Sequence, residues 1–161
     1  MRRRWTALAV VLSCLPCVGV PTVAQDTHYS ALVVTGTQAC VDSPGDEPVW
    51  TCTYTASDPR VAGTGSIRFA VGVSEPGSDA PVMWWIDTTL DGPDGTWSGH
   101  HYVFTDEAGT AHALMMLTGT GAYEGWQYVA SGTDPEADGN HDLVGLLYEG
   151  GAPPFGPLPT G

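Results

Sequence analysis

Residues 67–73 read Ile-Arg-Phe-Ala-Val-Gly-Val, so the apolar side chains Ile67, Phe69, Val71 and Val73 alternate with smaller or charged ones. Alternation with a period of two places successive side chains on opposite faces of a β-strand. The four apolar residues are therefore expected on one half-buried face. The segment predicts a strand that covers a core with one of its two sides.

Similar segments recur along the chain, and Gly, Pro, Asp and Asn cluster between them as turn residues do. No segment after residue 24 sustains the 3.6-residue period of a helix. This pattern predicts an all-β fold, a single antiparallel eight-stranded barrel, with a β-sandwich as the alternative. The expected strands are 30–36, 48–55, 61–73, 82–90, 95–105, 111–118, 123–132 and 142–149.

The first 24 residues have the three parts of a secretory signal peptide. Residues 2–4 are arginines, residues 5–20 are almost entirely apolar, and the small residue Ala24 stands at the expected cleavage position. A membrane span is the weaker alternative, because prolines interrupt the apolar run, and none is expected once the signal is removed. We therefore expect a secreted, extracellular protein with a signal peptide at 1–24, a β-barrel domain at 25–149 and a proline- and glycine-rich tail at 150–161.

The cysteines stand in two pairs. Residues 41–48, which lie between Cys40 and Cys52, have turn residues at their centre, so a hairpin would bring the two thiols face to face. In an oxidising compartment such a pair predicts one disulfide. The other pair, Cys14 and Cys17, lies in the signal segment and leaves a lipid anchor open as an alternative, although neither cysteine follows the usual small residues.

The charge of the chain excludes some partners. The chain has 18 acidic residues against five basic ones, a formal net charge of −13 at pH 7. Removal of the signal peptide would leave Arg60 and Arg68 as the only basic residues. Such a surface repels phosphate backbones and anionic lipid headgroups, so we expect neither nucleic acid nor peripheral membranes as partners. Neutral ligands, cations and cationic proteins are compatible with it.

Residues 117–126, LTGTGAYEGW, join one predicted strand to the next through a glycine-rich turn. Together with residues 96–99, TWSG, and 146–150, LLYEG, this stretch resembles the turn and following strand of the allene oxide cyclase and dirigent barrels. Residues 58–64, DPRVAGT, are more loosely similar to uncharacterised secreted bacterial proteins. The resemblance implies an eight-stranded barrel around an apolar cavity. Some members of these families cyclise a bound epoxide and others steer radical coupling, but none of their catalytic residues is matched here.

Aromatic side chains are the candidate ligand contacts. Trp84 and Trp85 are adjacent on one predicted strand, so one must face the interior and the other the outside. Tyr123 and Trp126 are separated by an odd step and are expected to divide between the two faces in the same way. The inward member of each pair would offer apolar area to a small apolar ligand.

The histidines make a weak case for a metal site. His100 and His101 are neighbours on a predicted strand and face opposite sides, so both cannot bind one metal ion. One of them could pair across strands with His112, and a third ligand would have to come from Asp87 or Glu124. Polar groups on a wet sheet face are the simpler interpretation, and no cofactor is expected.

One acidic turn has the opening of a calcium-binding loop. Asp134, Glu136 and Asp138 occupy alternate positions before Gly139, and Asp142 could add another oxygen. The last position of such a loop should be glutamate, but here it is glycine, and no helices flank the segment. The EF-hand interpretation therefore fails, which leaves weak calcium binding or a solvated acidic turn.

The chain lacks the sequence motifs of serine hydrolases, phosphate-binding loops and zinc proteases. A cavity isomerase would need only a buried carboxylate, for which Glu124 is the first candidate and Asp87 the second. Carboxylates on strands usually face solvent, which favours a non-enzymatic function. We expect a barrel that binds a small apolar ligand or serves as a structural surface module, with a cavity isomerase or cyclase resembling allene oxide cyclase as the alternative. The sequence does not indicate an oligomeric state.

Overall fold

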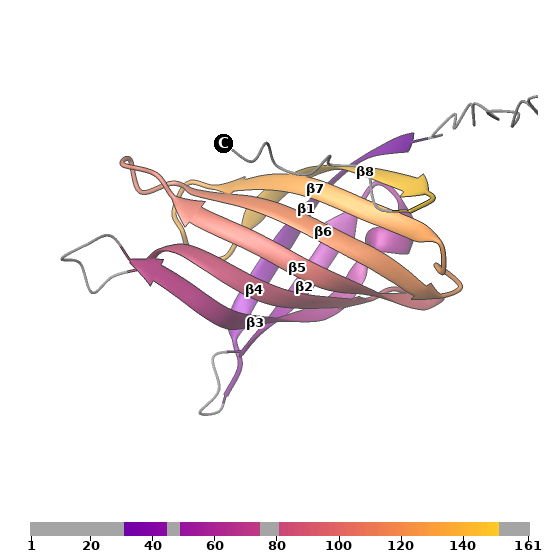
Figure 1. The fold of residues 1–161 in the computed structure, drawn as a ribbon, viewed down its shortest axis with the longest axis horizontal. Coiled ribbons are helices and arrows are strands. Elements are labelled where there is room, and N and C mark those ends of the chain that lie inside the picture. The colour runs from indigo at the N-terminus through magenta and orange to yellow at the C-terminus, as the bar shows by residue number, and fades with distance from the viewer. Residues whose placement is uncertain (1–30, 45–48, 75–80, 152–161) are drawn as a thin grey trace, which may run out of the picture.

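The computed structural model describes residues 31–44, 49–74 and 81–151, so the expected signal peptide and most of the tail lie outside the described residues. Eight antiparallel strands form a closed barrel in which each pairs with its sequence neighbours and the last returns to the first (Figure 1). The predicted barrel is confirmed, and the sandwich alternative is excluded because no strand has a free edge. The strands are β1 (Ala31–Asp42), β2 (Val49–Ala56), β3 (Gly63–Ser74), β4 (Pro81–Asp91), β5 (Gly95–Thr105), β6 (Ala111–Gly121), β7 (Trp126–Asp134) and β8 (His141–Glu149).

Seven of the predicted strands begin and end within three residues of the observed ones, and the first ends six residues later than predicted. Strand β1 continues past residue 36 to Asp42, because its second half pairs with β2 as far as Asp42 opposite Trp50. Strand β7 begins at Trp126 and not at residue 123, because the preceding residues form a tight turn in which the Tyr123 amide donates to the Thr120 carbonyl over 3.2 Å. A short 3-10 helix, η1 (Pro59–Val61), links β2 to β3.

The alternation of β3 is interrupted, and the expectation of one apolar face is wrong for half of it. Phe69 pairs with Ile86, but Val71 pairs with Trp85, so the register shifts by one residue between them. A bulge of this kind adds a residue to one strand and exchanges its two faces beyond that point. Ile67 and Phe69 therefore face the interior, whereas Val71 and Val73 are exposed on the outer surface.

Aromatic side chains seal one end of the barrel, which we call the closed end. Trp97 is fully buried there, stacks on Tyr123 with ring centroids 5.1 Å apart, and donates a hydrogen bond from Nε1 to the Arg60 carbonyl over 2.6 Å. The arginine side chain lies over the Trp126 ring at 4.2 Å. A Cβ atom at position 119 would lie 2.2 Å from the carbonyl oxygen of Tyr123. Because Gly119 has no Cβ, the turn that contains Tyr123 can pack closely against this strand.

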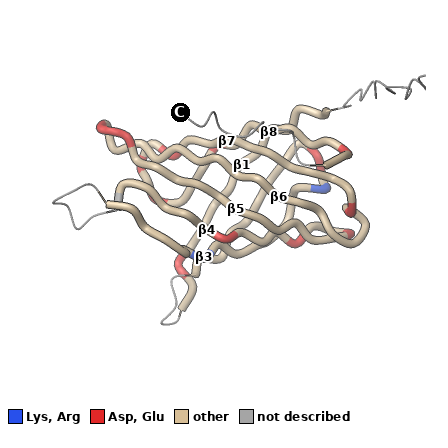
Figure 2. Tube along the Cα trace, viewed as in Figure 1, with Lys and Arg blue, Asp and Glu red and all other residues tan. Residues whose placement is uncertain are grey.

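The described acidic residues gather in the turns and at the strand ends, and only Asp87 lies in the middle of a strand (Figure 2). This distribution leaves the outer sheet surface largely uncharged, with exposed apolar side chains such as Trp85 and Phe104. No helix in the described ranges is both long and apolar enough to cross a membrane.

Cys40 and Cys52 lie opposite each other on β1 and β2, with Cα atoms 4.1 Å apart, and form the predicted disulfide. Both side chains are buried inside the barrel. The sulfur of Cys40 also accepts a hydrogen bond of 3.1 Å from Nε2 of Gln38. The disulfide therefore joins two strands and orients a polar side chain of the interior.

Replacing both cysteines with alanine should lower the free energy of unfolding by about 3 kcal/mol, because the cross-link closes a short loop in the unfolded chain. Urea denaturation of the oxidised protein and of the variant measures the difference. Thiol titration of denatured, unreduced protein should find Cys40 and Cys52 unreactive. Reactive thiols at both positions in protein that has never been reduced would contradict the bridge.

Candidate functional site

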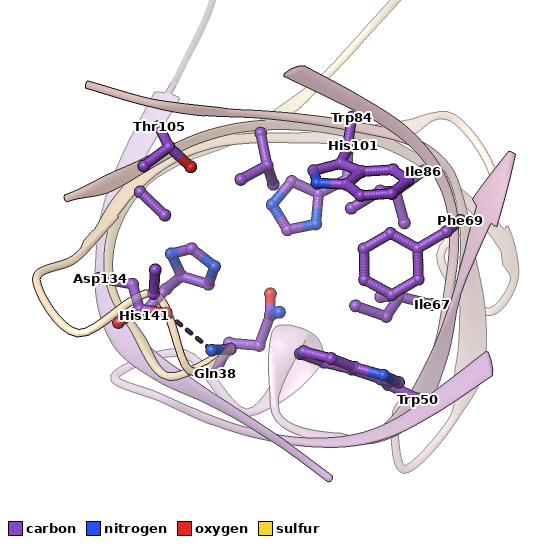
Figure 3. Close-up of a pocket in the computed structure, with 14 residues that line it drawn as sticks. Gln38, Trp50, Ile67, Phe69, Trp84, Ile86, His101, Thr105, Asp134 and His141 are labelled. Carbon is purple, nitrogen blue, oxygen red and sulfur yellow. Dashed lines mark hydrogen bonds between the residues drawn. The ribbon is translucent and has the colours of Figure 1, made fainter. Parts of the chain in front are cut away.

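A cavity of about 110 Å³ lies inside the barrel at the end opposite the Trp97 seal, which we call the open end (Figure 3). All eight strands and the turn between β7 and β8 contribute to its lining. Thr105 and Ala137, which are exposed, form part of its rim. The site is therefore an interior pocket with a mouth between strand ends.

One side of the cavity is aromatic. Trp50, Phe69 and Trp84 come from three successive strands and are half-buried against the core. Phe69 lies between the two indoles, each with its ring centroid 5.2 Å away in an edge-to-face arrangement. Such contacts hold the rings in place and leave an apolar wall suited to a flat hydrophobic group.

The other side of the cavity is polar. Gln38 on β1, His101 on β5 and His141 on β8 point toward it in Figure 3, and all three are almost completely buried. The two imidazole rings contact each other edge to face with centroids 5.8 Å apart. Within the described part of the chain, Gln38 Oε1, both ring nitrogens of His101 and Nδ1 of His141 have no hydrogen-bond partner.

Burial makes the two imidazoles neutral. It lowers the pKa of His101 to about 3, and the neighbouring His141 contributes to the shift. Burial also lowers the pKa of His141, although the carboxylates of Asp134 and Asp138 partly offset this effect. Each neutral ring offers one N–H donor and one nitrogen acceptor near pH 7.

Asp134 brings a buried carboxylate to the lining of the cavity, but backbone groups already engage it. Its Oδ2 accepts a hydrogen bond of 2.7 Å from the amide of Gly139, and its Oδ1 accepts one of 3.2 Å from that of Glu136. The carboxylate therefore organises the turn between β7 and β8. Glu136, Asp138 and Asp142 are exposed. No three His, Cys, Asp or Glu side chains among the described residues are grouped to hold a metal ion.

Trp84 and Trp85 face opposite sides of β4, as predicted. Trp84 lines the cavity, whereas Trp85 lies on the outer surface with 43% of its area exposed. Tyr123 and Trp126 do not divide in this way. Tyr123 belongs to the turn before β7, so the odd-step rule for strands does not apply to it, and both side chains pack at the closed end, away from the cavity.

His100 and His101 also face opposite sides, as predicted, but His112 is not a partner of His101. His100 is exposed and its Nδ1 lies 3.1 Å from Oδ1 of Asp87 on the outer surface. His112 makes a 2.8 Å contact through Nε2 with Asp106. The imidazole that contacts inward-facing His101 is that of His141, which lies on β8, far from it in the sequence.

Neither carboxylate proposed for an isomerase lines the cavity. Glu124 is exposed in the turn at the closed end, on a surface hollow in which half of the lining residues are glycines. Asp87 faces outward from β4, paired with His100. The buried carboxylate of the cavity is Asp134, which the sequence suggested for a different role.

Sequence reasoning missed Gln38, Trp50, Phe69 and His141 as site residues. The sequence did indicate that these side chains face inward. Each lies two residues from an apolar residue or a cysteine on its own strand, as His141 does from Leu143, and residues two apart on a strand face the same side. That spacing places a side chain inside the barrel but does not say at which end.

Comparisons with known proteins found no matching family model, no matching curated protein and no matching solved structure.

Proposed function

We propose that this chain is an exported, non-enzymatic barrel that binds a small, largely apolar molecule in the cavity at its open end. The observation that carries the proposal is a half-buried aromatic wall facing buried polar atoms without partners in the described chain. Native interiors rarely leave such atoms unpaired, and a pocket that combines apolar walls with a few polar groups is the usual form of a ligand site. A structural surface module would have no need of this cavity.

The size of the cavity limits the ligand. Its volume is about 110 Å³. Apolar cavities on the order of 150 Å³ in other proteins take up one benzene ring. The proposed ligand is therefore a single ring, with larger substituents directed out of the mouth. Export, proposed from residues 1–24, agrees with the buried disulfide between Cys40 and Cys52.

A single-ring compound should bind with saturation, and Trp84→Ala should weaken that binding about tenfold, because the aromatic wall loses one of its three rings. Calorimetric titration with toluene, phenol and 2-pyridone measures the affinity. Trp85→Ala is the matched control, since it removes the neighbouring indole from the outer surface and should leave the affinity unchanged. If none of the three compounds binds, the ligand-carrier proposal is wrong.

A cavity isomerase or cyclase resembling allene oxide cyclase is the second candidate. The unpaired imidazole nitrogens of His101 and His141 support it, because a neutral imidazole nitrogen that faces the cavity can accept a proton from a bound molecule. Their lowered pKa values make both histidines weak bases, which counts against this candidate. The available carboxylates favour the non-enzymatic function, since Glu124 and Asp87 face solvent and Asp134 is engaged by the backbone. The family resemblance of residues 95–150 remains part of this second proposal.

A further inference from the structure

The orientation of the Gln38 amide decides what the polar wall offers to a ligand. Its Nε2 donates to the sulfur of Cys40 over 3.1 Å, so the amide oxygen is the atom that is left without a partner. Gln38 is 1% exposed, so that oxygen is removed from bulk solvent. A buried carbonyl oxygen of this kind accepts from an N–H or O–H of the ligand.

The two buried histidines supply a hydrogen-bond donor to complement the Gln38 acceptor. Neither nitrogen of His101 has a partner in the described chain, and the side chain is 1% exposed. Nδ1 of His141, a side chain that is 5% exposed, is unpaired as well. Because a neutral imidazole carries one N–H, the wall includes at least one donor beside the acceptor of Gln38. Donor and acceptor groups therefore converge on one side of the cavity, facing the aromatic wall (Figure 3).

The charge of the lining favours a neutral ligand. None of the described residues that line the cavity is a lysine or arginine, so an anion would be buried without a counter-charge beside the carboxylate of Asp134. That carboxylate already accepts two backbone hydrogen bonds, which leaves fewer of its lone pairs to bind a cation. A neutral molecule that both donates and accepts satisfies the wall without burying a new charge.

We infer that the cavity selects a neutral, flat, single-ring molecule with an N–H donor next to a carbonyl acceptor, as in a cyclic amide. The ring lies against Trp50, Phe69 and Trp84, its N–H donates to Oε1 of Gln38, and its carbonyl accepts from the imidazole N–H of His101. This inference rests on the proposed ligand-binding function and specifies the class of molecule for the same site.

Calorimetry on the intact oxidised protein at neutral pH tests the inference with four single-ring probes: 2-pyridone, benzene, benzylammonium and benzoate. The affinity for 2-pyridone should exceed that for benzene about tenfold or more, because only the lactam satisfies the buried donor and acceptor. Benzylammonium and benzoate should bind more weakly than 2-pyridone.

Variants assign this preference to named atoms. Gln38→Met and, separately, His101→Leu should each reduce the ratio of the 2-pyridone and benzene affinities about tenfold, since each removes one polar partner. His100→Leu is the matched control, because His100 is adjacent on β5 but exposed on the outer surface, and the ratio should not change. Circular dichroism and thermal melting establish that each variant is folded, and either inward variant suffices for the test.

The outcomes separate this inference from the proposed function. Equal affinities for 2-pyridone and benzene, or a charged probe binding most tightly, would overturn the inference and leave a ligand-binding barrel. A preference for 2-pyridone that survives both inward substitutions would overturn the assignment to Gln38 and His101. If no probe binds at all, the inference and the proposed function both fail.

Discussion

Replacing Trp97 with alanine is expected to lower the free energy of unfolding by about 4 kcal/mol, because a large, fully buried side chain leaves a cavity at the closed end. The loss includes the stack on Tyr123, the edge contact with Tyr128 and the hydrogen bond to the Arg60 carbonyl. Urea denaturation at neutral pH, followed by far-ultraviolet circular dichroism, measures the change.

Two controls define this result. Trp85→Ala removes an indole from the outer surface, where 43% of its area is exposed, and should cost about 1 kcal/mol or less. Trp97→Phe keeps a ring opposite Tyr123 but loses the hydrogen bond, and should fall between the two. A loss for Trp97→Ala no larger than that for Trp85→Ala would mean that the closed end is not the packed seal described here.

Acidification from about pH 7 to about pH 4 should reduce the free energy of unfolding by about 3 kcal/mol through His101 alone. Its pKa in the folded protein is about 3, whereas an unfolded chain has the ordinary value of about 6.5. Between these values the unfolded state binds the proton and the folded state does not. Stability therefore falls as the pH decreases through this window, and is restored as the pH rises above it.

Other groups titrate over the same range, so the test compares variants. His141, which contacts His101 and has a lowered pKa, adds its own dependence. Neutralising surface carboxylates relieves repulsion in this acidic chain. The free energy of unfolding of the wild type minus that of His101→Leu isolates the contribution of one imidazole. His100→Leu, on the outer surface, is the matched control. A difference that stays constant between the two pH values would show that His101 is not buried as a neutral group.

The positions of the strands and turns could be predicted from short stretches of sequence. Alternation and turn residues placed seven of the eight strands within three residues of their positions, because both signals act between near neighbours in the chain, but ended the first strand six residues too early. The same parity argument separated Trp84 from Trp85 and His100 from His101 correctly. It failed at Val71, because the bulge before that residue has no distinctive local signature, and at Tyr123, because the turn extended further than expected.

Only a few residues of the candidate site could be predicted from the sequence. Trp84 was identified as a candidate and Asp134 was singled out for another role, but Gln38, Trp50, Phe69 and His141 were not recognised. The first three lie on the successive strands β1, β2 and β3, whereas His141 lies on β8, far from them in the sequence, and none of the four belongs to a motif. Their chemistry emerges when Gln38, His101 and His141 are buried around one space and left without hydrogen-bond partners in the described chain.

The sequence by itself determined the all-β class, the number of strands, the pairing of Cys40 with Cys52 and the opposite orientation of two adjacent pairs, Trp84 with Trp85 and His100 with His101. The tertiary structure decided which inward side chains meet. Closure of the barrel tilts and staggers the strands, so the level that a residue occupies depends on the register of every pair around the ring. That stagger brings His141 of β8 against His101 of β5 and seals the opposite end with Trp97 and Tyr123. Because register is a property of the closed sheet, the cavity exists only in the folded barrel.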